Sequence, residues 1–132
     1  NEVFMHIKKL RFSMLRMDYQ TKENYEIYMW YCKQLIDRYV LLPSGEVTRQ
    51  YRGNPSGQIS TTMDNNMCNV FFQAFEMAYI ASGLDDDDLL EYWGSFDSLV
   101  YGDDRLSRMP IIPEVIDAFH YRDKMIKMYK DV

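Results

Sequence analysis

One stretch, residues 52–66, constrains this chain more than any other because it joins strong helix breakers to a strong helix start. Its first half alternates flexible and rigid residues, at Gly53, Pro55 and Gly57, which excludes a regular helix or strand there. In its second half Ser60 or Thr61 can cap a helix, and Asp64 follows Thr61 at capping-box spacing. We therefore expect a glycine loop that leads directly into a long helix over residues 60–81.

That helix should begin with a row of polar side chains on one face. Thr61, Asn65 and Asn69 recur at every fourth position, so they line the same side of the first turns. Asparagine is a poor helix former, so placing it inside a helix lowers helix stability. That loss is understandable where the side-chain amide binds a polar ligand. The alternative is a well-capped surface helix after an ordinary turn. Another face of the helix is apolar and is expected to be buried, with Met63, Met67, Phe71, Ala74 and Ala78.

A second feature is a pair of neighbouring acids within residues 96–107, which have the pattern of strand, two-residue turn and strand. The strands are apolar and flank a turn at Gly102-Asp103, with Leu99, Val100 and Tyr101 before it and Leu106 after it. Asp103 and Asp104 would therefore be held on rigid backbone, which suits a hard cation such as Mg²⁺. The four-acid run at 85–88 lacks such a frame, and we expect a solvated loop there.

Together the two features carry a resemblance to a known family. The pattern Ser-Gly-x3-Thr-x3-Asn, formed by Ser56, Gly57, Thr61 and Asn65, is followed by Tyr-Gly-Asp-Asp at 101–104. In this order and at this separation they resemble motifs B and C of viral RNA-dependent RNA polymerases. The sequence around these motifs looks most like the astrovirus polymerase. The similar segments are Leu-Leu-Pro-Ser-Gly-Glu-Val-Thr at 41–48, Gly-Asn-Pro-Ser-Gly-Gln at 53–58, Thr-Thr-Met-Asp-Asn-Asn at 61–66 and Tyr-Gly-Asp-Asp-Arg-Leu at 101–106.

The resemblance implies an α/β fold, the palm subdomain of a right-hand polymerase, in which helices back an antiparallel sheet that carries the acidic hairpin. Residues 1–132 would form one palm fragment with motifs B and C. The family's motif A, with its further metal-binding aspartate, and its basic fingers motif are not in this sequence. The chain also opens without an initiator methionine, so we expect a piece of a viral polyprotein that is inactive alone.

The resemblance also implies the chemistry and the roles of the site residues. The reaction is nucleotidyl transfer from ribonucleoside triphosphates, with two Mg²⁺ ions as cofactors and Mn²⁺ as a substitute. Asp103 would be the main metal ligand and Asp104 a supporting one. Ser56, Thr61 and Asn65 would sense the ribose of the nucleotide, and Gly57 would let the loop flex.

The implied partners are an RNA template, a primer or product strand, ribonucleoside triphosphates and the rest of the polyprotein. The implied location is the host cytoplasm, at membrane-associated replication sites. The net charge of −5, from 15 basic and 20 acidic residues, argues against strong RNA binding by this piece alone. No apolar run reaches the ~18 residues of a membrane span, and two isolated cysteines suggest reduced thiols.

Two other functions stay open at this point. An RNA-templated DNA polymerase also places two aspartates after a tyrosine at a hairpin, and the Ser-Gly-x3-Thr-x3-Asn pattern is what discriminates against it. A non-catalytic RNA-binding or interaction module would need a basic face and exposed aromatics on a sheet. The chain has neither a Gly-x-Ser-x-Gly nucleophile elbow nor a Walker-type phosphate loop.

The remaining elements are expected from periodicity and turn residues. An amphipathic helix over 2–17 should bury one apolar face and expose Lys8, Lys9 and Arg11; its apolar positions are Val3, Ile7, Leu10, Met14 and Met17. A second helix over 21–38 carries an aromatic stripe expected to be core, with Tyr25, Tyr28, Trp30 and Tyr31. A hairpin over 39–51, a loop over 109–113 and a final helix over 114–130 complete the chain.

Overall fold

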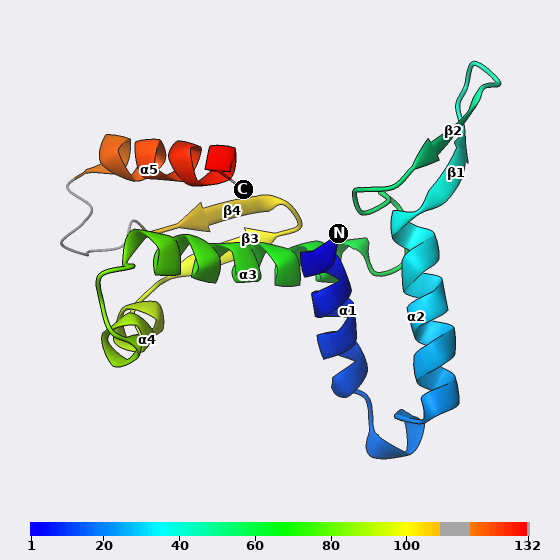
Figure 1. Ribbon diagram of the computed structural model, residues 1–132, viewed down its shortest axis with the longest axis horizontal. Helices are drawn as coiled ribbons and strands as arrows, with labels where there is room; N and C mark the ends of the chain where they lie inside the picture. The colour runs from blue at the N-terminus through cyan, green and yellow to red at the C-terminus, as the bar shows by residue number, and fades with distance from the viewer. Residues whose placement is uncertain (109–116, 132) are drawn as a thin grey trace. The chain divides into compact units, whose positions relative to one another are not determined.

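The computed structural model describes residues 1–108 and 117–131 (Figure 1). The chain divides into two compact units, Asn1–Cys68 and the residues from Asn69 onward. Both units mix helices with strands, so the α/β class is confirmed. In the described residues the strands form two separate two-stranded antiparallel sheets, and the arrangement of a polymerase palm stays a prediction.

The first unit begins with two helices that lie side by side (Figure 1). They are α1 (Glu2–Ser13) and α2 (Lys22–Ile36), joined through the short 3₁₀ helix η1 (Met17–Tyr19). Helix α2 begins close to the predicted position, and Thr21 caps it because its side chain accepts a hydrogen bond from the backbone N–H of Asn24. The predicted hairpin follows, with β1 (Arg38–Leu41) paired to β2 (Val47–Gln50).

The buried face of α1 differs from the prediction. The helix ends at Ser13, and Leu10, Met14 and Met17 are exposed. Its buried residues are Phe4, Ile7, Lys8 and Phe12. Placing Lys8 on the solvent face was therefore wrong, and the reason is a buried carboxylate described below.

The aromatic stripe of α2 is core only in part. The ring of Phe12 on α1 packs against the rings of Tyr25 and Tyr28, with centroids 5.2 and 5.5 Å away. Trp30, in contrast, is 64% exposed, so its assignment to the core was wrong. Cys32 on the same helix is buried, and both it and Cys68 are free thiols, as expected.

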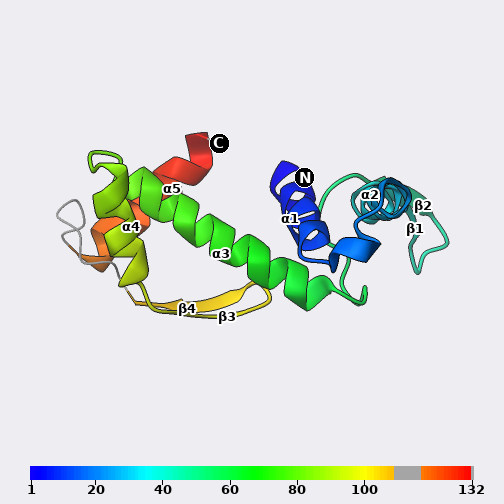
Figure 2. The ribbon, with the colours of Figure 1, turned by 90° about the horizontal axis from the view of Figure 1, so that it is seen from below.

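Helix α3 (Thr61–Ile80) starts in the first unit and continues into the second, close to the predicted bounds. The second unit then adds α4 (Asp86–Gly94), the hairpin of β3 (Ser98–Tyr101) and β4 (Asp104–Ser107), and α5 (Ala118–Asp131). Figure 2 shows the hairpin alongside the part of α3 that belongs to this unit. The small core of the unit consists of Ile80, Ala81, Met125 and Met128, with Leu84, Leu89, Tyr92 and Tyr121 packed against it.

Two predictions for this region were wrong. Three residues of the predicted buried face of α3 are exposed: Met63, Phe71 and Ala78. The polar Asp64, Gln73 and Glu76 are buried instead, because other elements bring them partners. The four-acid run is the start of α4 rather than a loop, since the Asp85 side chain caps the helix by accepting from the Asp88 N–H.

The predicted loop at 109–113 and the first residues of the final helix, 114–116, lie outside the described residues. Within the described part of the chain that helix is α5. No helix in residues 1–108 and 117–131 is long and apolar enough to cross a membrane.

Candidate functional site

The glycine loop takes its shape from two residues in left-handed backbone conformations. Gly53 and Gly57 have φ of 84° and 82°, which a residue with a Cβ adopts only with strain. The Thr61 hydroxyl closes the loop onto α3, since its oxygen lies 2.7 Å from the Pro55 carbonyl oxygen and 2.9 Å from that of Gln58. Because a hydroxyl has only one proton, the Thr61 hydroxyl donates its hydrogen bond to a carbonyl oxygen of the loop.

Asn65, the next residue of the polar row, is oriented by the same loop. The Nδ2 group of Asn54 donates to Asn65 Oδ1 at 2.8 Å. In residues 1–108 and 117–131 the amide NH₂ of Asn65 donates to no acceptor, so this donor remains available to a ligand. Ser56 and Gly57 are exposed at the tip of the loop. Ser56 and Gly57 are therefore accessible, whereas Thr61 and Asn65 are half-buried.

Beneath the loop lies a fully buried carboxylate that the sequence did not lead us to expect. Asp64 has 0% exposure and accepts hydrogen bonds from both Lys8 (2.6 Å) and Arg11 (2.5 Å) on α1. It also accepts from the loop, from Gln58 Nε2 at 2.8 Å and Ser60 Oγ at 2.9 Å. Burial opposes its charge, but the hydrogen bonds outweigh that effect and hold the pKa of Asp64 below its ordinary value.

The predicted capping box is therefore wrong. The Thr61 backbone N–H donates to the Gln58 carbonyl oxygen at 3.1 Å rather than to Asp64, whose carboxylate pairs with Lys8 and Arg11 of α1. The available sequence signal was the spacing of Lys8 and Arg11, which puts two cations on one side of a helix. Nothing in the sequence says that a carboxylate distant along the chain is their partner.

The acidic hairpin of the second unit forms as predicted. Tyr101 pairs with Asp104, so Gly102 and Asp103 are the two turn residues. Gly102 has φ of 66°, and the described residues include no non-glycine residue with positive φ, which fits a type II′ turn. Asp103 and Asp104 are both exposed. Their carboxylates accept no hydrogen bond within the part of the chain that is described.

Buried polar residues of α3 hold the strands of this hairpin. Gln73 Oε1 accepts from the Ser107 hydroxyl at 3.1 Å, and Glu76 accepts from Arg105 Nη2 at 2.6 Å. Glu76 is 3% exposed and also accepts from the hydroxyls of Tyr121 (3.2 Å) and Tyr129 (2.7 Å) on α5. Burial, together with the nearby carboxylate, raises the pKa of Tyr121 to about 12. Glu76 thus ties three elements together, with Arg105 compensating its buried charge.

The loop before α3 and the acidic turn after it are the two features on which the family resemblance depends. A family model described as viral RNA-dependent RNA polymerase matches residues 1–132, the full length of the chain. The chain belongs to the viral RNA-dependent RNA polymerase family.

Comparison with individual proteins supports the resemblance to astrovirus polymerases. The non-structural polyprotein 1AB of mink astrovirus 1 is 57% identical over 131 residues, which cover 99% of this chain and 9% of the relative. That of ovine astrovirus 1 is 51% identical over 132 residues, 100% of the chain and 9% of the relative. That of human astrovirus-1 is 48% identical over 130 residues, 98% of the chain and 8% of the relative.

The chain thus spans less than a tenth of the length of these polyproteins. Both steps of the predicted resemblance, to the polymerase family and to astrovirus proteins, are confirmed. No solved structure matches the chain significantly.

The exposed acids fit the divalent metal that this polymerase family normally uses. Two neighbouring carboxylates on a rigid turn, with no hydrogen-bond partner in the described residues, offer the oxygen ligands that Mg²⁺ takes in small number together with phosphates. Within residues 1–108 and 117–131, no group of three or more His, Cys, Asp or Glu side chains is arranged to hold a metal ion. Asp103 and Asp104 therefore remain candidate ligands, and other ligands would have to complete the site.

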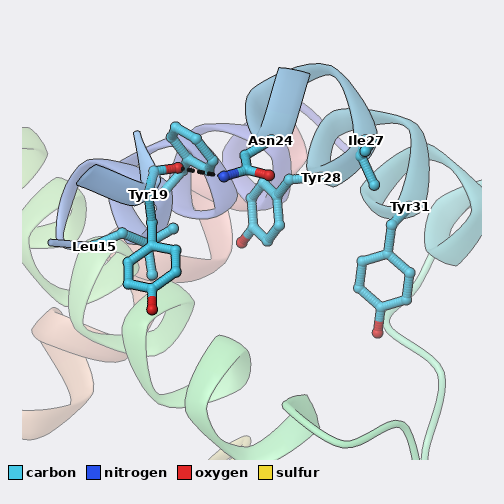
Figure 3. Close-up of a pocket in the computed structure, with 7 residues that line it drawn as sticks. Leu15, Tyr19, Asn24, Ile27, Tyr28 and Tyr31 are labelled. Atoms are coloured by element: carbon cyan, nitrogen blue, oxygen red, sulfur yellow. Dashed lines mark hydrogen bonds between the residues drawn. The ribbon is translucent and has the colours of Figure 1, made fainter. Parts of the chain in front are cut away.

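A pocket of about 390 Å³ lies elsewhere in the first unit, between α1, η1 and α2 (Figure 3). Its lining is mostly aromatic and aliphatic, consisting of Phe12, Leu15, Tyr19, Asn24, Ile27, Tyr28 and Tyr31. Figure 3 shows the one polar side chain besides the tyrosines, Asn24, donating to the Tyr19 backbone carbonyl at 2.9 Å. The pocket includes none of the predicted site residues.

Proposed function

We propose that this chain is part of an RNA-directed RNA polymerase, which carries out templated nucleotidyl transfer from ribonucleoside triphosphates in viral genome replication. The observation that carries the proposal is the family match over residues 1–132, together with the two exposed acids at the Gly102 turn, whose carboxylates have no partner in residues 1–108 and 117–131. The family match favours RNA synthesis over an RNA-templated DNA polymerase and over a non-catalytic RNA-binding module. We propose that residues 1–132 supply part of the palm, with motif A and the fingers provided by other parts of the polyprotein.

The acidic hairpin supplies metal ligands in this proposal. Asp103 extends from the turn and would be the main ligand, while Asp104, the first residue of β4, would support it. Two Mg²⁺ ions, or Mn²⁺ in their place, would neutralise the charge that develops on the attacking and leaving oxygens of the phosphoryl transfer. A further carboxylate would come from outside residues 1–132, so this segment alone would not incorporate nucleotides.

The glycine loop and the start of α3 bind the sugar in this proposal. Ser56, Thr61 and Asn65 would contact the ribose of the incoming nucleotide, and Gly57 would allow the loop to move as RNA advances. Asn65 is the best candidate for reading the 2′-hydroxyl. Its oxygen already accepts a hydrogen bond from Asn54, whereas its NH₂ group donates to no acceptor in residues 1–108 and 117–131.

The partners follow from the same proposal. They are an RNA template, a primer or product strand, ribonucleoside triphosphates and the remainder of the polyprotein. Because residues 1–132 have a net charge of −5, the basic surfaces that contact RNA phosphates would lie largely in other parts of the enzyme. The site of action would be the host cytoplasm, at membrane-associated replication complexes.

The test is incorporation of labelled ribonucleotides on an RNA template by the full-length polymerase. We expect Asp103→Asn to abolish incorporation with little effect on folding, since an exposed turn side chain contributes little packing. Asp104→Asn should reduce incorporation less completely. Asp87→Asn, at an exposed position of α4, is the matched control and should retain activity. Near-normal incorporation by Asp103→Asn would remove the hairpin from the proposed site.

A further inference from the structure

One polar residue of α3 contacts the acidic turn itself rather than its strands. Asn69 Nδ2 lies 3.1 Å from the backbone carbonyl oxygen of Asp103 and 3.4 Å from that of Gly102. Both acceptors belong to the two-residue turn that presents the Asp103 carboxylate. Asn69 therefore holds the backbone of the turn and does not engage the acidic side chains.

The direction of the Asn69 amide is set by a neighbour one turn further along α3. Gln73 Nε2 donates to Asn69 Oδ1 at 3.2 Å, and Gln73 is only 3% exposed. The opposite amide orientation would place the Asn69 oxygen against two carbonyl oxygens and its NH₂ against a donor. The chain of bonds from Ser107 through Gln73 to Asn69 thus directs a donor at the turn.

The hairpin depends on such anchors because an isolated two-stranded hairpin is only marginally stable in water. Its strands are held through Gln73 and Glu76, and the Leu99 and Leu106 side chains are each 73% exposed, so apolar burial adds little. The turn lies beyond these strand contacts. The Asn69 amide anchors the turn itself to α3.

We propose that Asn69, oriented by Gln73, is a positioning residue that fixes the turn backbone so that the Asp103 carboxylate is preorganised to bind a divalent metal. This inference rests on the proposed metal-binding role of Asp103. Mg²⁺ requires nearly ideal geometry from its ligands, and small displacements of a catalytic group cost large factors in rate. Loss of the Asn69 bonds lets the turn sample other positions and so weakens metal binding before it weakens the fold.

The experiment compares Asn69→Ala with Asn24→Ala in the full-length polymerase. The control removes the same type of bond, from a side-chain amide to the backbone carbonyl of Tyr19, far along the chain from the hairpin. Two quantities are measured: the dissociation constant for Mn²⁺, from the paramagnetic resonance signal of the free ion, and the Mg²⁺ concentration that gives half-maximal incorporation. Asn69→Ala should raise both by about 2- to 10-fold, which corresponds to one net hydrogen bond, while Asn24→Ala leaves both unchanged.

A second variant keeps the test decisive where Asn69→Ala folds poorly. Gln73→Met keeps an unbranched side chain of similar length in a buried position and removes the bond that orients Asn69, so it should shift both quantities in the same direction. Folded Asn69→Ala or Gln73→Met with wild-type metal dependence overturns the positioning role. Failure of both variants to fold also overturns it, because the contacts are then purely structural.

The outcome for Asp103 separates this inference from the proposed function. If Asp103→Asn abolishes incorporation while Asn69→Ala binds Mn²⁺ as the wild type does, only the positioning role fails. If Asp103→Asn incorporates nucleotides normally, the proposed function of the hairpin fails whatever Asn69 does.

Discussion

The ammonium nitrogen of Lys8 lies 2.6 Å from a carboxylate oxygen of Asp64, and the two side chains are only 1% and 0% exposed. Lys8 also donates to Ser60 Oγ at 3.1 Å, so this cation contacts the residue that precedes α3 as well as its buried acid. A charge removed from water in this way is tolerated only when its partner and further hydrogen bonds compensate it. The network therefore links α1 to the glycine loop, and removal of either charged group alone would leave the other buried without that partner.

Removal of the Lys8 charge should strongly destabilise the first unit. Lys8→Met fills a similar volume but leaves the Asp64 carboxylate buried with Arg11 as its remaining cation. Breaking one side of a buried ion pair typically costs about 3–5 kcal/mol. We expect a clear fall in the melting temperature of the full-length polymerase. Lys9→Met, at the exposed neighbouring position, is the control, and equal melting temperatures for the two variants would refute the assigned role of Lys8.

The same network predicts a dependence of stability on pH. Burial alone would raise the pKa of Asp64, but hydrogen bonds, first of all from Lys8 and Arg11, hold it below the ordinary 3.8. The charged carboxylate thus contributes stability above about pH 4, and that contribution is lost as the pH falls through the folded-state pKa. Melting temperatures of wild type and Asp64→Asn should differ most near pH 7 and converge only as the pH falls through the folded-state pKa, which lies below 3.8. A difference that does not shrink in acid would contradict this reading.

Gly102 offers a test of the acidic turn that leaves every carboxylate in place. A methyl group there would meet no atom within 4 Å, but φ of 66° strains any L-residue. Gly102→Ala should therefore cost about 1–2 kcal/mol and reduce incorporation. Gly94→Ala is the matched control, because Gly94 in α4 also has open space and no positive φ. Comparable incorporation and melting temperatures for these two variants would show that the turn geometry is unimportant.

The hairpins and most helices were predictable from sequence because their signals are local. Turn residues such as Gly102 set a two-residue turn without help from distant parts of the chain. The Thr21 cap and the loop glycines act in the same way. The family motifs added the identities of the candidate residues, including Asp103 and Asn65, which local rules alone leave as a turn and a helix start.

The buried faces could not be read in this way, because burial depends on partners far along the chain. The polar side of α3 is buried where α1 supplies Lys8 to Asp64 and where β4 supplies Arg105 to Glu76. The periodicity argument uses only the spacing of apolar residues, so it predicted that Met63 is buried, although Met63 is 55% exposed. The start of α4 was missed for a related reason, since acids at a helix N-terminus are stabilised by the backbone dipole.

Sugar selectivity tests the role proposed for Asn65. This residue accepts one hydrogen bond from Asn54, and its NH₂ group donates to no acceptor among the described residues. If that group donates to the 2′-hydroxyl, Asn65→Ala removes a bond made only with ribonucleotides, which is worth roughly 0.5–1.5 kcal/mol and up to about 3 where a partner is left unsatisfied. The preference for ribo- over deoxyribonucleotides should fall by about 2- to 100-fold.

Asn54→Ala is the matched control for this prediction, because it removes the bond between the two amides and leaves the Asn65 NH₂ in place. It should slow incorporation of both sugars and lower their ratio less than Asn65→Ala does, because the amide that donates to the sugar is still present. The ratio is measured by competition between labelled ribo- and deoxyribonucleotides in the full-length polymerase. An unchanged ratio in Asn65→Ala, with both rates reduced as in Asn54→Ala, would mean that Asn65 supports the glycine loop and does not read the sugar.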